Sequence, residues 1–359
     1  MYAAMTHRRV FLHAIGILMI CTLLLSLPLP DVSQAETPAL THTFYIPLVR
    51  ATDLSGKIAM NLIDTSSTHT LNKLEVLDAA SLTIAELGQG DSPSWSPDGT
   101  KIAFLAYREI SLEAKLYVIN PDGSGETKLS NTPAGAEEPR WSPDGTKILF
   151  QIYNQPSTYW AIINADGTAE RPLFDNMAGD GPVWSPDGAK IAFSIPNQAI
   201  YIMNADGSGT KKLADSTTWD PTPRWSPDGT KITFMSESGG QKTIFVVAAD
   251  GAGVKQLTDG SKSSYYPVWS PNSDKIVYAE VEGSASSIIM MNADGSGRRV
   301  LAGGNVWEPI WSPDGNYVAF TFCDRGSCGL WAVSIHSAVQ INLTTPAPGL
   351  RLANMQWHT

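Results

Sequence analysis

A Trp-Ser-Pro tripeptide recurs six times along the 359-residue chain, and this repeat constrains the fold more than any other feature. The tripeptides are spaced by 41 to 46 residues, and Trp357 continues the spacing without Ser-Pro. They open at Trp95, Trp141, Trp184, Trp225, Trp269 and Trp311. A period of this length indicates an array of similar units that stack around a shared core.

Each period predicts the same four strands. A first strand ends in Trp, and a Ser-Pro-Asp-Gly turn follows, in which Pro fixes φ and Gly takes a positive φ. An apolar second strand (Lys101 to Leu105 in the first period), a variable loop and a third strand (Leu116 to Ile119) come next. An Asn-x-Asp-Gly hairpin then leads into a short fourth strand that closes on Leu129. Four antiparallel strands in about 40 to 50 residues are typical of a β-propeller blade.

We therefore predict an all-β fold, a single seven-bladed β-propeller over residues 51–359. Sets of second-to-fourth strands begin near Lys57, Lys101, Lys147, Lys190, Lys231, Lys275 and Tyr317. The first set lacks its own Trp strand, and the C-terminal segment Asn354 to His358 is a Trp strand with nothing after it. Joining the two closes the ring and leaves no open sheet edge. The alternative is six blades plus an N-terminal extension.

The charge balance limits the kind of partner. With 25 Lys and Arg against 35 Asp and Glu, the formal net charge is −10. This balance argues against a nucleic-acid backbone or an anionic membrane surface. We expect no nucleic-acid partner, no membrane association after export, and a monomer.

The N-terminus has the layout of a secretory signal peptide. Arg8 and Arg9 precede an apolar stretch from Val10 to Leu29, and a small-residue site at Ser33-Gln34-Ala35 follows. We expect residues 1–35 to be removed after Ala35 and residues 36–50 to form a linker that could include an edge strand. The mature chain is then periplasmic, extracellular or at the cell surface. A retained membrane anchor is the alternative, and the general and twin-arginine export routes both stay open.

Three cysteines are too few for a disulfide scaffold or a four-cysteine zinc site. Cys323 and Cys328 fall at the end of the second strand and the start of the third strand of the last complete blade. Cross-strand partners at such positions come within disulfide reach. In an exported chain we predict a disulfide between them, with two free thiols as the alternative.

Ten aspartates belong to the two kinds of regular turn, and we expect their carboxylates to accept hydrogen bonds from backbone N–H groups there. They are Asp98, Asp144, Asp187, Asp228 and Asp314 in the first kind, and Asp122, Asp166, Asp206, Asp250 and Asp294 in the second. In one degenerate turn Ser273 replaces the glycine. A non-glycine residue at positive φ costs about 1 kcal/mol, so the sequence predicts that Ser273→Gly stabilises the fold.

The repeat xPxWSPDGxKIAF, followed by an apolar strand and NADGSG, resembles the propeller repeats of the TolB-type family over the whole mature chain. The resemblance implies the propeller fold. TolB itself is a periplasmic protein that binds partner proteins, and it carries an additional N-terminal α/β domain. We expect no such domain here, because only about fifteen residues separate Ala35 from the propeller.

Related propellers also occur in enzymes, and their motifs are missing from this sequence. Similar repeats form the propeller of prolyl-oligopeptidase-like peptidases, whose hydrolase domain carries a G-x-S-x-G motif; the sequence contains none. Some propeller lyases use histidines and a metal, whereas the mature chain has only the scattered His42, His69, His336 and His358. We expect no cofactor, and a divalent cation is the alternative left open.

Strand alternation places both regular turns on one face of the ring, which we call the turn face. The second-to-third loops and the blade crossings then lie on the other face, which we call the variable face. Variable loops on a rigid scaffold are where binding sites usually lie. The crossings place the candidate ligand residues near the expected channel mouth: Asp91, Glu138, Asp180, Asp220, Tyr266, Trp307 and Glu308. The second-to-third loops add Tyr107, Arg108, Tyr159, Glu237 and Arg325.

Two hypotheses of different classes follow. The first is a secreted, non-catalytic binding or scaffold propeller that engages a protein, peptide or glycan through the variable face, a protein or peptide being the expected partner. The second is a hydrolase or lyase that acts on a polysaccharide or peptide with carboxylates at the channel mouth. We assign no catalytic residue, and the candidate acids could equally be solvated loop residues. Arg140 and Arg224 are expected to pair with acids of neighbouring blades.

Overall fold

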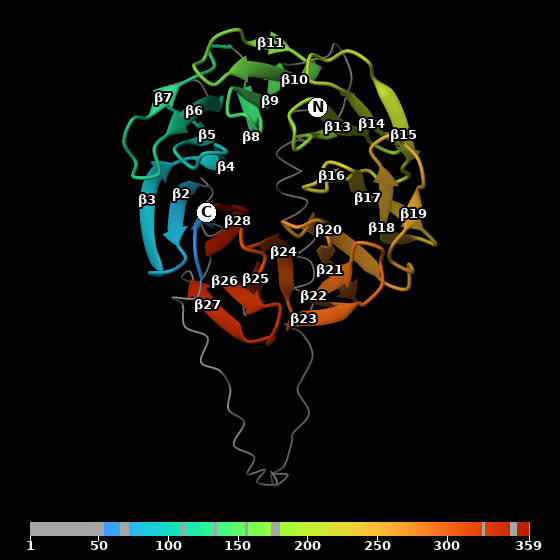
Figure 1. Ribbon diagram of the computed structural model, residues 1–359. Helices are drawn as coiled ribbons and strands as arrows, with labels where there is room; N and C mark the ends of the chain where they lie inside the picture. The colour runs from blue at the N-terminus through green and yellow to red at the C-terminus, as the bar shows by residue number, and fades with distance from the viewer. Residues whose placement is uncertain are drawn as a thin grey trace, which may run out of the picture. The chain divides into compact units, whose positions relative to one another are not determined.

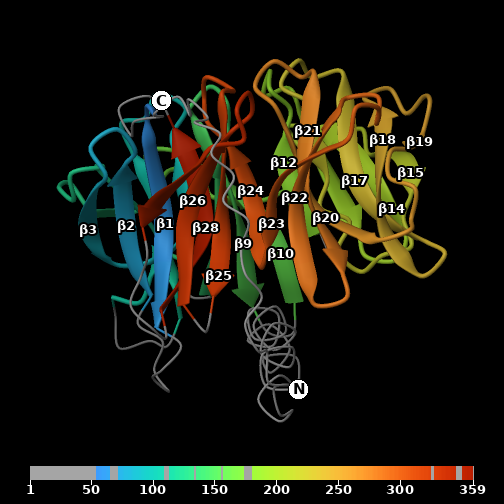
Figure 2. The same cartoon turned by 90° about the horizontal axis from the view of Figure 1, so that it is seen from below.

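The computed structural model describes residues 54–64, 72–108, 113–132, 135–154, 157–173, 180–324, 327–344 and 350–358. These residues form seven four-stranded antiparallel sheets, arranged as the blades of a ring (Figure 1). Seen from the side, the strands run between the two faces of the ring (Figure 2). No helix in this part of the chain is long and apolar enough to cross a membrane. The predicted signal peptide and linker lie outside the described residues.

Each blade contributes one strand to each of four concentric positions. The innermost strands are β4 (Asp91–Trp95), β8 (Gly135–Trp141), β12 (Asp180–Trp184), β16 (Arg224–Trp225), β20 (Ser263–Trp269), β24 (Val306–Trp311) and β28 (Leu350–His358). The second strands are β5 (Ile102–Ala106), β9 (Lys147–Asn154), β13 (Lys190–Ile195), β17 (Lys231–Ser238), β21 (Lys275–Glu282), β25 (Tyr317–Asp324) and β1 (Lys57–Asp64).

The third and outermost strands are given in the same order of blades. The third strands are β6 (Lys115–Ile119), β10 (Ser157–Asn164), β14 (Ala199–Asn204), β18 (Gln241–Ala248), β22 (Ala285–Asn292), β26 (Ser327–Ser334) and β2 (Lys73–Asp78). The outermost strands are β7 (Thr127–Lys128), β11 (Arg171–Pro172), β15 (Lys211–Asp215), β19 (Lys255–Gln256), β23 (Arg299–Gly304), β27 (Gln340–Thr344) and β3 (Thr83–Gln89).

The ring closes as the sequence predicts. The C-terminal strand β28 pairs antiparallel with the N-terminal strand β1, and Ile58 lies opposite Trp357 in the register. The order β28-β1-β2-β3 therefore makes a seventh blade from both ends of the described propeller. The seven-bladed prediction is confirmed, and the six-bladed alternative is wrong.

The hydrophobic core lies between the blades, because the second strand of each sheet is covered on both faces. An aromatic residue recurs at the same place in the second strand of six blades, and each is at most 1% exposed: Phe104, Phe150, Phe193, Phe234, Tyr278 and Phe320. Met60 holds this place in the closing blade and is fully buried. Strands buried on both faces read as continuous apolar runs, which explains the Lys-Ile-Ala-Phe pattern of the repeat.

The repeat tryptophans link neighbouring blades through their indole N–H groups. Nε1 of Trp141 donates to the carbonyl oxygen of Ser94 at 3.1 Å, and Nε1 of Trp311 donates to that of Val268 at 3.1 Å. In each case the acceptor is the residue before the Trp of the preceding blade, and the same bond is made by Trp95, Trp184, Trp225 and Trp269. Trp357 differs, because its indole donates to Ser55 within its own blade at 2.8 Å. Six inter-blade bonds therefore follow the ring.

The ten turn aspartates all accept a backbone N–H two residues further on, as predicted. In the first kind of turn the preceding serine also donates to the carboxylate, as Ser96 does to Asp98 at 2.6 Å. In eight of the ten, the hydrogen bond from a neighbouring Ser or Thr hydroxyl has the largest effect and lowers the carboxyl pKa. These acids are thus turn-forming groups.

Acid should therefore destabilise the propeller through its turns. Since these carboxyl pKa values are lower in the folded chain than in the unfolded one, their contribution to stability is present above a pH of about 4 and is lost as the pH falls further. We expect the urea midpoint to drop as the pH is lowered from 5 to 3. Asp144→Asn removes one such group, so its midpoint should be lower at pH 7 and should fall less on acidification. An unchanged acid dependence in a combined variant of several turn aspartates would contradict this.

The degenerate turn behaves differently from the sequence expectation. Ser273 does adopt a positive φ of 63°, yet its hydroxyl also accepts the backbone N–H of Asp228 in the neighbouring blade at 3.0 Å. Glycine would relieve about 1 kcal/mol of strain but would lose a hydrogen bond of similar value. We now expect Ser273→Gly to leave the melting temperature nearly unchanged, and Ser273→Ala, which keeps the strain, to lower stability by about 1 kcal/mol. Equal melting temperatures for the two variants would contradict the strain assignment.

Candidate functional site

A β-bulge recurs on the inner strands, three residues before the repeat Trp. The strand register shifts there in six blades. The bulge residues all have positive φ: Ser92, Glu138, Gly181, Thr222, Tyr266, Glu308 and Asn354. Only one of them is glycine, and left-handed conformations of other residues are strained and cluster at functional sites. Three of the candidate residues, Glu138, Tyr266 and Glu308, thus share one structural position.

In β8 the bulge residue Glu138 forms an ion pair within its own strand. Oε2 of Glu138 lies 2.9 Å from NH2 of Arg140, and their side chains are 47% and 24% exposed. The guanidinium of Arg140 also lies over the ring of Trp160, 5.9 Å from its centroid. Among the described side chains Arg140 therefore pairs with an acid of its own strand, and the expected pairing with an acid of a neighbouring blade is not made.

Arg224 occupies the same position as Arg140 two blades further on, but has Thr222 in place of the glutamate. Its guanidinium makes no hydrogen bond or ion pair within the described part of the chain. Burial, together with the charge of Arg140, lowers the pKa of Arg224 to about 10, while Asp220 and Glu138 act in the opposite direction. The β12 blade lies between the β8 and β16 blades that carry these two arginines (Figure 1). Among the described side chains, the predicted pairing of Arg224 with an acid of a neighbouring blade is not made.

At Glu308 the strand β24 has the bulge glutamate without the arginine two residues later. The carboxylate of Glu308 forms no hydrogen bond or ion pair with any described residue, and burial raises its pKa to about 7. Solvent still reaches part of the side chain, so the carboxylate is enclosed by protein without being sealed from water. Burial, Glu308 and Asp220 together raise the pKa of Tyr266. We call Glu138, Arg140, Asp220, Arg224, Tyr266 and Glu308 the inner-rim cluster.

Asp91 lies in a second group, formed around the ring closure. Its carboxylate accepts Nδ2 of Asn72 at 2.6 Å and Nδ2 of Asn354 at 3.2 Å, so it is already held by neutral donors. Burial raises its pKa against these bonds. Burial also raises the pKa of Tyr107, a residue that is 58% exposed, with smaller contributions from Asp91 and Glu137. This group is more fully satisfied than the inner-rim cluster.

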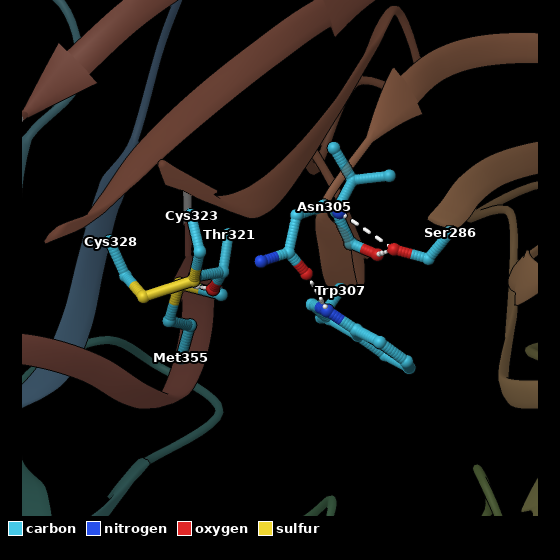
Figure 3. The surroundings of a disulfide bond; sticks show 8 residues. Ser286, Asn305, Trp307, Thr321, Cys323, Cys328 and Met355 are labelled. Carbon is cyan, nitrogen blue, oxygen red and sulfur yellow. Dashed lines mark hydrogen bonds between the residues drawn. A yellow bond between two sulfur atoms is a disulfide. The ribbon is translucent and has the colours of Figure 1, made fainter. Parts of the chain in front are cut away.

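The predicted disulfide is present and lies beside an aromatic group. Cys323 and Cys328 are joined, with their Cα atoms 4.0 Å apart, and Met355 of β28 lies next to them (Figure 3). Nε1 of Trp307 donates to Oδ1 of Asn305 at 2.7 Å (Figure 3). Its ring also meets that of Tyr265 edge to face, with centroids 6.5 Å apart. Trp307, the residue before Glu308, is thus held by one hydrogen bond and one aromatic contact.

Other candidates are placed apart or outside the described side chains. The backbone of Asp180 pairs with Ser194 at the start of β12, but its side chain is not described. Arg325 lies outside the described residues. Arg108 is paired with Glu126 at 3.0 Å, and Glu237 lies 3.9 Å from Lys242. Within the described ranges, no group of three or more His, Cys, Asp or Glu side chains is arranged to hold a metal ion.

Two shallow depressions lie on the opposite, turn face, between neighbouring blades. Their volumes are about 500 and 420 Å³, and the larger is lined by Pro97, Asp98, Trp141 and Asp144 among others. The carboxylates of both aspartates are already bonded within their own turns. The two aspartates of the larger depression therefore offer no free carboxylate to a ligand.

The sequence alone points to all six residues of the inner-rim cluster, but it does not predict which of their charges are paired. A partial signal for the pairing is visible in the repeat: the residues three before and one before the Trp are Glu and Arg in one blade, Thr and Arg in another, and Glu and Ile in a third. Comparing these two positions around the ring identifies a charge with a partner, a base without an acid and an acid without a base.

Solved structures of similar fold include TolB proteins, a lyase and peptidases. TolB from Acinetobacter baumannii has a TM-score of 0.57 and 19% identity, over 85% of this chain and 67% of that one. An oligogalacturonate lyase in complex with manganese has a TM-score of 0.64 and 16% identity, over 74% and 84%. The acylaminoacyl peptidase of Pyrococcus horikoshii has a TM-score of 0.61 and 16% identity, over 81% and 51%. At such identities the likeness concerns the fold alone.

No curated protein sequence matches the chain. The family described as the TolB beta propeller domain matches residues 60–194 and 153–354, which span nearly all of the described propeller. The WSPDG repeats, the seven closed blades and this match agree. The chain belongs to the TolB beta propeller domain family.

Proposed function

We propose that this protein is a non-catalytic binding propeller, which recognises a peptide segment of a partner protein at the inner rim of its variable face. The observation that carries the proposal is Glu308, a partly exposed carboxylate with no ion pair among the described residues, beside Tyr266 and Trp307. An enclosed charge without a partner is costly, and a basic side chain of a ligand supplies the missing one. Aromatic side chains are the usual anchors of such contacts.

We also propose that the protein is exported from the cytosol. A disulfide on the hairpin that ends β25 and begins β26 is stable in an oxidising compartment and rare in the cytosol. TolB, to which the fold is similar, supports a binding role by analogy only.

Selection from a random peptide display library tests the binding role. We expect the wild-type protein to enrich peptides that contain Lys or Arg, and the double variant Tyr266→Ala/Trp307→Ala to enrich none. Val254→Ala changes an apolar residue that is 51% exposed and belongs to neither the inner-rim cluster nor the Trp307 contacts, and it serves as the control that retains binding. Equal enrichment by the double variant and the wild type would overturn the proposed site, provided that all three proteins unfold at similar temperatures.

The enzyme hypothesis is retained on one observation. A carboxyl group with a pKa of about 7 is suited to general acid–base catalysis near neutral pH, and Glu308 is such a group. Propellers of similar fold occur in a lyase and a peptidase. Turnover of oligosaccharides or peptides by the wild type that is lost in Glu308→Gln would favour the enzyme over the binding protein.

A further inference from the structure

The inner-rim cluster carries two opposite charges that have no ion pair within the described part of the chain, and they lie on alternate blades. On β8 the bulge glutamate and the arginine two residues later neutralise each other. On β16 only the arginine, Arg224, is present, and on β24 only the glutamate, Glu308. Neither makes a hydrogen bond or ion pair among the described residues.

Tyr266 lies on β20, the blade between these two charges. The charges of Glu308 and Asp220 help to raise the pKa of Tyr266, and Asp220 also acts on the pKa of Arg224. The order along the inner rim is therefore a base, an aromatic ring and an acid. Glu308 and Arg224 do not neutralise each other, because the Tyr266 blade separates them.

We propose that the inner rim is a two-charge recognition site, in which Arg224 binds a carboxylate and Glu308 binds a basic group of the same peptide, with Tyr266 between them. The inference rests on the proposed function and adds a second requirement, that the ligand is acidic as well as basic. A guanidinium offers several N–H donors in a fixed plane and suits a carboxylate, which it binds by two parallel hydrogen bonds. Arg140 lies close by but is already paired with Glu138, so Arg224 is the arginine left for the ligand.

The peptide selection separates the two charges. The wild type should enrich peptides that contain both an acidic and a basic residue. Arg224→Gln should lose the enrichment of Asp and Glu but keep that of Lys and Arg, and Glu308→Gln should do the reverse. Arg171→Gln removes an exposed arginine of the outermost strand β11 and is the matched control, with the wild-type pattern.

Synthetic versions of one enriched peptide then identify the carboxylate. Changing the peptide's acidic residue to its amide should weaken binding about tenfold, or by about 1.4 kcal/mol. Arg224→Gln should cause the same loss with the unchanged peptide. The two changes together should weaken binding no more than either change alone. Arg224→Lys keeps the charge but cannot form two parallel hydrogen bonds with a carboxylate, so it should bind the peptide with intermediate affinity. Loss on amidation of the peptide C-terminus instead assigns the terminal carboxylate to Arg224. Additive losses would overturn the assignment of the carboxylate to Arg224.

A small dicarboxylate tests the arginine subsite without any peptide. Succinate at constant ionic strength should raise the melting temperature of the wild type and not that of Arg224→Gln. If the wild type enriches no peptide yet shows this response, the proposed function fails and the subsite stands. If peptides are enriched without a preference for acidic residues, the proposed function stands and the two-charge site is overturned. If the wild type enriches no peptide and succinate does not raise its melting temperature, the proposed function and the two-charge site are both overturned.

Discussion

Replacing Trp269 by Ala should lower the free energy of unfolding by about 3–5 kcal/mol, the range for a large buried aromatic side chain. Trp269 is 5% exposed and packs in a cluster with Ile244, Leu257 and Tyr278. Its indole N–H also donates to the carbonyl oxygen of Arg224 in the preceding blade at 3.3 Å. The substitution thus removes both the packing between two blades and the hydrogen bond that links them. Urea unfolding followed by circular dichroism measures the loss.

Phenylalanine separates the hydrogen bond from the packing. Trp269→Phe keeps an aromatic ring and leaves the Arg224 carbonyl without its indole donor, so we expect it to cost about 1–2 kcal/mol. Trp357→Phe is the matched control, because the indole of Trp357 bonds Ser55 in its own blade instead of a neighbouring blade. Loss of the inter-blade bond should broaden the unfolding transition only for Trp269→Phe. Equal transitions for the two variants would show that the indole bonds do not couple the blades.

The fold could be predicted from the sequence because each period contains the turn segments that define its own strands. The Ser-Pro-Asp-Gly and Asn-x-Asp-Gly segments specify turns through local hydrogen bonds, which need no distant partner. The tryptophan periodicity then fixes the number of blades, and the unmatched strands at the two ends predict the closure seen between β1 and β28.

The bulges on the inner strands could not be predicted in the same way. Six of the seven bulge residues precede a proline, which by itself favours an extended conformation for the residue before it. Their positive φ is imposed by the strand pairing on either side, as the register shift between Trp307 and Ile310 shows. Tertiary contacts override the local preference here, and this happens on the strands that carry the candidate site.

The candidate site was only partly predictable, because the state of a charge depends on residues from other blades. Glu138 and Glu308 occur in the same sequence context, each followed by Pro, one residue and Trp. Glu138 is nevertheless exposed and paired, whereas Glu308 is enclosed and has no ion pair with any residue that the structure describes. The arginine two residues after Glu138 explains the first case and is visible in the sequence. The enclosure of Glu308 arises from the packing of neighbouring blades, which the repeat pattern does not show.

Replacing Glu308 by Gln should stabilise the protein at pH 8 by about 3 kcal/mol and have little effect at pH 4. Burial raises the pKa of Glu308 from its ordinary value of 4.5 to about 7, so between these two values the folded chain holds a proton that the unfolded chain has released. Stability therefore falls as the pH rises through this window and is constant above it. A shift of this size corresponds to about 3 kcal/mol.

Glutamine stays neutral, so the fall in stability between pH 4.5 and 7 should be smaller in Glu308→Gln than in the wild type. Urea midpoints at half-unit intervals of pH measure this slope, and Val254→Ala controls for an unrelated surface change. A basic ligand group at Glu308 favours the charged carboxylate, so a bound peptide should oppose the wild-type loss of stability near pH 7 and leave Glu308→Gln unaffected. Parallel stability curves for the wild type and Glu308→Gln would show that the carboxylate is solvated like an ordinary surface acid. Glu308 would then not be an enclosed charge at the inner rim.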